Sequence, residues 1–114
     1  LPGKAINLGI KASKGFYIVC LSAHCIPKAK KWLDSLISPL TKNSKVVAVY
    51  GRQEPYAYSS ALDKRDLLTT FGLDKIIQKK DPFFHNANSA FSCNTWKKFP
   101  FNEKVVNVED RLWG

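Results

Sequence analysis

The chain has 114 residues, with 18 Lys and Arg against 9 Asp and Glu, so its formal net charge is +9, and 45% of its residues are hydrophobic. A chain of this length and apolar content can bury one core but leaves little room for two, which predicts a single domain over residues 1–114. The charged fraction of 24% argues against intrinsic disorder. No apolar run approaches the roughly 20 residues that a membrane-spanning helix needs.

The cysteines of the chain are Cys20, Cys25 and Cys93. Their odd number and the lack of paired C-x-x-C spacing argue against a disulfide framework and against a structural zinc knuckle. A zinc site that joins Cys20, His24 and Cys25 is an alternative, but Cys20 lies within a predicted strand and a fourth ligand is not evident. We therefore expect a reducing compartment and a cytoplasmic location. The chain also contains no Met, which predicts that it is part of a longer protein.

The first half of the chain predicts an α/β unit. Residues 3–12 place small and apolar side chains at helical spacing, and residues 16–21 form a continuously apolar run typical of a strand covered on both faces. Residues 32–40 follow the pattern of an amphipathic helix, and residues 46–50 give a second buried strand. Residues 16–50 thus predict a β-α-β unit with a right-handed crossover in a parallel sheet.

Capping signals mark the elements of the second half. The stretch Ser60-Ala-Leu-Asp63 resembles a capping box, and the helix that follows is expected to end at Gly72. An aromatic, asparagine-rich segment then covers residues 83–91, and a short helix is expected around residues 94–98. The Glu-Asp pair at residues 109–110 follows an apolar stretch and is typical of a charged helix start.

The tripeptide Ser22-Ala23-His24 follows the first predicted strand. In open α/β sheets ligands bind beyond the carboxyl ends of the strands, so this tripeptide lies where chemistry is expected. The imidazole of His24 can ligate a divalent metal there, or it can be a loop histidine bonded to a backbone carbonyl. The residue pattern leaves both interpretations open.

Two further groups of polar side chains are candidates for a site. The carboxylate pair Glu109 and Asp110 can serve as general base and orienting partner, or it can complement the dipole of the helix that it opens. The amides of Asn86 and Asn88 lie among aromatic residues and suit sugar hydroxyls, although the same residues commonly build a turn.

The positive charge indicates an anionic partner. The basic residues are scattered, only three of the 18 cations are Arg, and no nucleic-acid-binding motif appears, so we expect no specific nucleic acid partner. Attraction to diphosphates or to an anionic membrane surface explains the charge equally well. Peripheral association with the inner face of the cytoplasmic membrane is therefore compatible with the sequence.

Several short motifs, taken in order, carry a resemblance to a known family. They are Gly3-Lys-Ala-Ile-Asn-Leu-Gly9, Gly15-Phe-Tyr-Ile-Val-Cys-Leu-Ser-Ala-His-Cys25, Trp32-Leu33, Gly51-Arg-Gln53, Asn86-Ala-Asn-Ser-Ala90 and Glu109-Asp-Arg-Leu-Trp113. The set resembles the central and later part of a family 2 glycosyltransferase, as in bacterial enzymes that build surface polysaccharide. The resemblance implies a partial GT-A domain, which is a Rossmann-like three-layer sandwich with a mostly parallel sheet.

The resemblance also implies a reaction and a metal. A sugar would pass from a nucleotide-sugar donor to a glycan or lipid-linked acceptor in polysaccharide biosynthesis, with inversion at the anomeric carbon. The family's Asp-x-Asp motif, which holds Mn²⁺ or Mg²⁺ against the diphosphate, falls by position on Ser22-Ala23-His24, where both carboxylates are missing. His24 is then the expected metal ligand, with a preference shifted toward Mn²⁺, and a metal-independent reaction that relies on lysines stays open.

The family motif for the catalytic base falls on Glu109 and Asp110, of which Asp110 is the expected base and Glu109 its neighbour or substitute. The other implied contacts are to the donor diphosphate at Lys4, Asn7, Ser22, Ala23 and His24, and to the sugar and acceptor at Arg52, Gln53, Asn86, Asn88 and Trp113. Family members begin with a segment that holds the nucleotide base and ribose, which the sequence lacks, so we expect no sugar transfer by this chain alone. The alternative function is a non-catalytic basic domain that binds carbohydrate or nucleic acid.

Overall fold

The computed structural model describes residues 1–81, 83–106 and 109–114, with the backbone only at residues 109 and 111. In chain order its elements are α1 (Pro2–Ala12), β1 (Tyr17–Leu21), α2 (Trp32–Lys42), β2 (Ala48–Tyr50), α3 (Ala61–Phe71), β3 (Asn88–Ser92), α4 (Cys93–Lys98) and α5 (Glu109–Trp113). Most of the predicted helices and both predicted strands are present. The strand β3 begins within the asparagine-rich segment, where no strand was predicted.

The described strands form one sheet in the order β1-β3-β2. Both pairings are antiparallel, and Phe91 of β3 lies opposite Ile18 on one side and Ala48 on the other. Since β1 and β2 are each antiparallel to β3, they run in the same direction, as a β-α-β unit requires, but they do not adjoin. The expectation of a mostly parallel sheet is therefore not met among the described strands, because β3 inserts between the two strands that were expected to be parallel neighbours.

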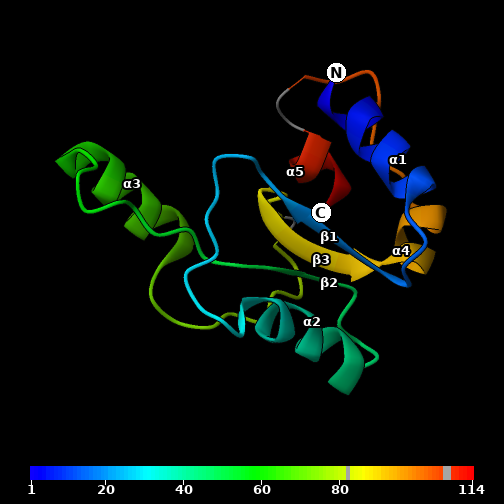
Figure 1. Cartoon of the computed structure of the whole chain (residues 1–114), viewed down its shortest axis with the longest axis horizontal. Coiled ribbons are helices and arrows are strands. Elements are labelled where there is room, and N and C mark those ends of the chain that lie inside the picture. The colour runs from blue at the N-terminus through cyan, green and yellow to red at the C-terminus, as the bar shows by residue number, and fades with distance from the viewer. Residues whose placement is uncertain (82, 107–108) are drawn as a thin grey trace.

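Helices lie on both faces of the sheet (Figure 1). The helix α2 contacts β2 and β3 on one face, while α1, α4 and α5 gather on the other. The helix α3 extends away from this body. Along each strand the side chains alternate between the two helical layers, which is the period of a pleated strand. The layers agree with the expected α/β sandwich. In the described part of the chain, no helix is long and apolar enough to span a bilayer.

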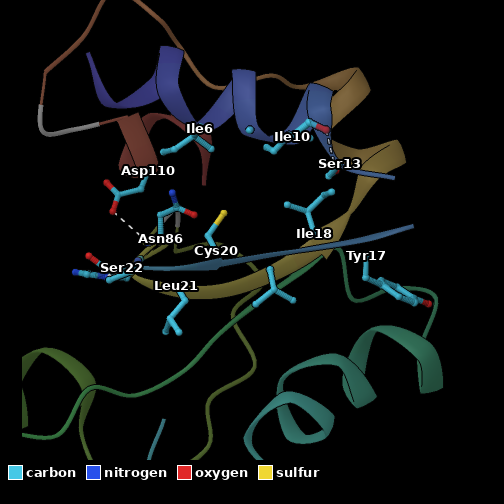
Figure 2. Close-up of a pocket in the computed structure, with 14 residues that line it drawn as sticks. Ile6, Ile10, Ser13, Tyr17, Ile18, Cys20, Leu21, Ser22, Asn86 and Asp110 are labelled. Atoms are coloured by element: carbon cyan, nitrogen blue, oxygen red, sulfur yellow. Dashed lines mark hydrogen bonds between the residues drawn. The ribbon is translucent and has the colours of Figure 1, made fainter. Parts of the chain in front are cut away.

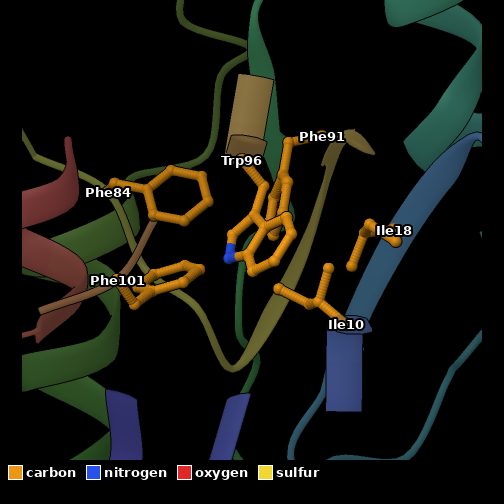
Figure 3. Packing of buried hydrophobic residues seen from close by; sticks show 6 residues of the cluster. All are labelled: Ile10, Ile18, Phe84, Phe91, Trp96 and Phe101. Carbon is orange, nitrogen blue, oxygen red and sulfur yellow. The ribbon is translucent and has the colours of Figure 1, made fainter. Parts of the chain in front are cut away.

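The hydrophobic core lies between the sheet and the α1 layer (Figure 3). Its buried members are Ile10, Ile18, Phe84, Phe91, Trp96 and Phe101. Phe91 is completely buried and Phe101 is 2% exposed, so the segment directly after α4 contributes a residue to the core alongside the central strand. A side chain on Gly3 would overlap the backbone carbonyl of Asn102, which explains why α1 needs glycine where that segment crosses it.

The ends of α3 match their sequence signals. The Ser60 side chain accepts a hydrogen bond from the backbone N–H of Asp63 at 3.1 Å, as an N-cap does. Gly72 ends the helix with φ of 63°, a left-handed conformation that glycine adopts without steric cost. The predicted start and end of α3 are therefore confirmed. Both signals act within a single turn of backbone, which is why they can be recognised in the sequence.

Candidate active site

A groove of about 600 Å³ runs along β1, between that strand and α1. Most of its lining is apolar, whereas polar side chains gather near the carboxyl end of β1 (Figure 2). These polar residues are Ser22, His85, Asn86 and Asp110. They come from the end of β1, the segment that leads into β3, and α5. The polar end of the groove is therefore assembled from parts of the chain that are distant in sequence.

Asp110 projects from α5 toward Asn86 (Figure 2). The backbone N–H of Asn86 donates to Asp110 Oδ2 at 3.3 Å, across a separation of 24 residues. Asp110 and Asn86 thus lie together at the polar end of the groove, and their roles as base and as contact to sugar or acceptor stay predictions. Glu109 was predicted as the neighbour or substitute of Asp110, and its side chain lies outside the described part of the structure.

Trp113 anchors the helix that carries Asp110. Its indole stacks on Phe101 with ring centroids 5.1 Å apart and an angle of 16° between the planes. It also contacts the rings of Phe84 and Phe91, at centroid distances of 4.9 and 4.8 Å. These contacts engage the half-buried ring of Trp113 with the core, and its contact with sugar or acceptor stays a prediction. Its described role is to hold α5 against the sheet, and so to position Asp110.

The tripeptide after β1 is fixed by backbone and side-chain hydrogen bonds. The N–H of Ser22 donates to the carbonyl of Ala87 at 2.8 Å, which extends the contact between β1 and the segment before β3. The Ser22 hydroxyl lies 3.0 Å from His24 Nδ1, and the Tyr56 hydroxyl donates to the backbone carbonyl of His24 at 3.2 Å. Ser22 lines the groove, while Ala23 and His24 are exposed beside it.

The metal prediction depends on His24. The nearest potential donor is the neutral hydroxyl of Ser22, and the two groups are bonded to each other. Within the described ranges, no group of three or more His, Cys, Asp or Glu side chains could hold a metal ion. One imidazole and one hydroxyl do not form a complete site for a divalent metal ion, so Ser22 and His24 do not fit such an ion by themselves. The contact of His24 with a metal stays a prediction.

The two asparagines that were predicted together lie on different faces of the sheet. Asn86 lines the groove, and its side-chain oxygen accepts from the Ser89 hydroxyl at 2.9 Å. The side-chain oxygen of Asn88 instead accepts from Trp32 Nε1 at 2.9 Å, on the side of α2. A side chain on Gly51 would overlap the Asn88 amide. Asn88 therefore joins β3 to α2, and its contact with sugar or acceptor stays a prediction.

His85 is a site residue that the sequence interpretation missed. It lines the groove, and its Nδ1 lies 3.1 Å from the side-chain nitrogen of Gln53. The backbone N–H of Ala87 donates to the same Nδ1 at 3.4 Å, so Nδ1 is an acceptor and the ring proton is assigned to Nε2. Gln53 thereby reaches the polar end of the groove through His85. The sequence feature that could have pointed to His85 is its position directly before Asn86, which was itself predicted to contact sugar or acceptor.

Arg52 is engaged elsewhere. Its guanidinium forms an ion pair with Glu54 and donates to the backbone carbonyl of Gly72 at 3.4 Å. Glu54 is also paired with Lys28, and the hydrogen bond from Lys28 is the main cause of a lowered pKa for the Glu54 carboxyl. Arg52 does not line the groove, and its contact with sugar or acceptor stays a prediction.

Asn7 holds the core together. It is 3% exposed, and its amide nitrogen donates to the Phe101 carbonyl at 2.8 Å and to Glu103 Oε1 at 3.0 Å. Its oxygen accepts from Trp96 Nε1 at 2.8 Å and from the N–H of Phe101 at 3.1 Å. Both donors and both acceptor positions of the amide are therefore used. The amide of Asn7 is thus engaged inside the core, whereas Lys4 is exposed on α1; the contacts of both residues with the diphosphate stay predictions.

The Cys20 thiol faces the groove (Figure 2). Burial raises the pKa of Cys20 to about 11, and a hydrogen bond with Ser89 opposes part of that rise. The thiol is therefore protonated at neutral pH, so it is neither an activated nucleophile nor a ready thiolate ligand. All three cysteines are unpaired.

Comparison with known proteins identifies the family. A family model described as glycosyl transferase family 2 matches residues 2–99. No curated protein and no solved structure gives a significant match. The matched range includes the groove and the tripeptide after β1, and it stops before Glu109 and Asp110. Since the match covers most of the chain, the chain belongs to glycosyl transferase family 2, which indicates glycosyltransferase activity in general.

Proposed function

We propose that this chain carries the acceptor-activating part of an inverting glycosyltransferase, which uses a nucleotide-sugar donor and a hydroxyl of a glycan or lipid-linked acceptor in polysaccharide biosynthesis. The observation that supports this proposal most directly is the meeting of Asp110 with Asn86 at the polar end of the groove. The family match does not favour the alternative of a non-catalytic basic binding domain.

The proposed chemistry centres on the Asp110 carboxylate. It accepts the proton of the acceptor hydroxyl, whose oxygen forms a new bond to the anomeric carbon of the donor sugar. The bond from that carbon to the diphosphate breaks, and the nucleoside diphosphate leaves with the electron pair, so configuration inverts. The N–H of Asn86 donates to one carboxylate oxygen and orients it, which supports a role of Asp110 as the general base.

We assign the donor diphosphate to the region of Ser22, Ala23 and His24. Two features support this assignment: the position of the tripeptide beyond the carboxyl end of β1, and the bond between Ser22 and His24 that limits rotation of the imidazole. If Ser22 donates to Nδ1, His24 Nε2–H is a donor that suits an anionic oxygen. We further propose a cytoplasmic location, which the three unpaired cysteines support.

The test is Asp110→Asn in the longest natural chain that contains these residues. The amide keeps the shape of the carboxylate but cannot accept the proton, so we expect turnover to fall roughly 10² to 10⁴-fold while the dissociation constant of the donor is unchanged. Asp74→Asn, which removes an exposed carboxylate in the turn after α3, is the charge-matched control. Near-normal turnover of Asp110→Asn, or an equal loss in the control, would reject Asp110 as the base.

A further inference from the structure

A second hollow, of about 570 Å³, opens where β1 begins, at the end of that strand away from Asp110. Three lysines line it: Lys11 from the last turn of α1, Lys14 from the loop that follows, and Lys97 from the last turn of α4. We call this feature the basic hollow. Among the described residues that line it there is no Asp or Glu.

Besides the lysines, the side chains with nitrogen or oxygen donors that line the basic hollow are Ser13, Asn94 and Trp96. The Ser13 hydroxyl already donates to the Ile10 carbonyl at 2.8 Å, and the Trp96 indole N–H already donates to Asn7 at 2.8 Å. Ile10 and Trp96 are buried, at 5% and 8% exposure, so they provide an apolar floor. The lysine side chains are exposed and can turn toward a ligand.

An apolar surface adjoins the charged rim. Phe16 also lines the basic hollow and is 58% exposed. Its ring meets Tyr17 edge to face, with centroids 4.9 Å apart, which fixes its orientation. A ring held in this way offers a flat surface for the aromatic or aliphatic part of a ligand.

Electrostatics make an anion the fitting occupant. Three like charges around one hollow repel each other, and an anion between them removes that cost. None of the ion pairs found in the described part of the chain uses Lys11, Lys14 or Lys97. The lysine ammonium is a compact point charge that suits phosphate, and a group with two negative charges interacts with all three lysines more strongly than a carboxylate does.

We propose that the basic hollow binds a phosphate or diphosphate group whose apolar or aromatic body covers Phe16. Two sources share this chemistry: a soluble nucleotide and the phosphorylated head of a lipid. The basic hollow adjoins the groove that carries Asp110 and shares Ile10 and Ser13 with it, but its three lysines do not line that groove, so they supply a second point of attachment for a phosphorylated molecule. It does not depend on the proposed base.

The first experiment compares two double variants of the 114-residue chain. Lys14→Gln with Lys97→Gln removes two charges from the basic hollow, and Lys42→Gln with Lys45→Gln removes two charges from exposed sites at the end of α2. Both variants have the same net charge and leave the core intact. The affinity for pyrophosphate is measured by calorimetry at low salt, together with the backbone amide resonances that shift.

We expect the first double variant to bind pyrophosphate roughly 10 to 100-fold more weakly than the unmodified chain, because each lysine contributes about one factor of ten at contact distance in water. The control should lose less than about threefold, and the shifted resonances should belong to residues 11–16 and 93–97. Equal losses in the two variants would show general attraction to a basic surface and would overturn the proposal, as would no measurable binding by the unmodified chain.

The second experiment identifies the source of the phosphate and tests the role of Phe16. The ligands are uridine diphosphate and vesicles of phosphatidylcholine with phosphatidic acid, each compared with pyrophosphate. One of the two ligands has an apolar or aromatic part that contacts the Phe16 ring, and Phe16→Ala should weaken its binding at least fivefold. Binding of pyrophosphate, which has no such part, should be unchanged. The ligand that shows this difference is the source. If Phe16→Ala changes the affinity for neither ligand, the proposed contact between the apolar or aromatic part of the ligand and the Phe16 ring is wrong.

Discussion

Replacement of Asn7 by Ala should remove much of the stability of this chain. The change deletes an amide that joins α1 to α4 and to the segment at Phe101 through four hydrogen bonds. It leaves Trp96 Nε1–H and the N–H and carbonyl of Phe101 without that partner, in a site where Asn7 was 3% exposed. Each buried polar group left unpaired costs about 1–3 kcal/mol, so the free energy of unfolding should fall by roughly 3 kcal/mol or more.

That loss is large against the roughly 5–15 kcal/mol by which domains are usually stable. It is measured by urea unfolding, followed through tryptophan fluorescence and far-ultraviolet circular dichroism. Asn94→Ala, at an exposed position of α4, is the control and should change stability by less than about 0.5 kcal/mol. A loss below about 1 kcal/mol for Asn7→Ala would refute the structural role that the four hydrogen bonds assign to this amide.

The isosteric change Asn7→Asp adds a test by pH. The introduced carboxyl would replace the nitrogen that donates to the Phe101 carbonyl and to Glu103, so two oxygens and a like charge would face it. Burial and that charge raise its pKa in the folded state above the ordinary value. A raised folded-state pKa means that this variant is most stable at low pH and loses stability as the pH rises through that pKa. If this variant instead gains stability as the pH rises through that pKa, the assignment of the Asn7 nitrogen as donor to Phe101 and Glu103 is wrong.

Three further outcomes follow from local features. Cys20, whose pKa burial raises to about 11, should react with iodoacetamide in the folded chain only as the pH approaches that value, and rapidly near pH 9 once urea unfolds it; mass spectrometry of the alkylated peptide measures both. Lys28→Gln should raise the pKa of Glu54, because the hydrogen bond from Lys28 is the largest cause of its lowering; a carboxyl titration by nuclear magnetic resonance that shows no rise would contradict this. Ser60→Ala should cost about 1 kcal/mol by removing the cap from the N–H of Asp63, and hydrogen exchange at the first turn of α3 should accelerate; unchanged exchange there would count against the cap.

The helices were predictable because their signals are local. The boundaries of α3 depend on Ser60 and Gly72, and each acts on neighbouring backbone groups. The strand β3 was not predictable in the same way, because Asn-Ser-Ala-Phe-Ser has no β-branched residue and its polar positions are typical of a turn. Its extended conformation is set by pairing with two strands that lie far away in the sequence. Family membership implies the GT-A fold, and the antiparallel β3 is the element that the expectation of a mostly parallel sheet did not include.

The candidate site was predictable in part. The family motif pointed to Asp110, but its contact with Asn86 depends on how α5 packs, which no spacing in the sequence specifies. Asn7 and Trp113 were assigned to ligands because a polar or aromatic residue within a family motif looks the same whether it serves the core or the site. The fold adds their partners, which the sequence does not show: four internal hydrogen bonds for Asn7, and a stacked contact with Phe101 for Trp113.

The position of β3 in the middle of the sheet bears on the order in which the chain can fold during synthesis. The strands β1 and β2 are made first, yet neither has its hydrogen-bonding partner in this sheet until residues 88–92 leave the ribosome. Until then the edges of both strands that pair with β3 remain without that partner. Pairing between segments so far apart in sequence is slow, and unpaired strands are prone to misassembly in that interval. We therefore expect chaperone binding to nascent chains to be strongest before residue 92 emerges and to decline once β3 has closed the sheet.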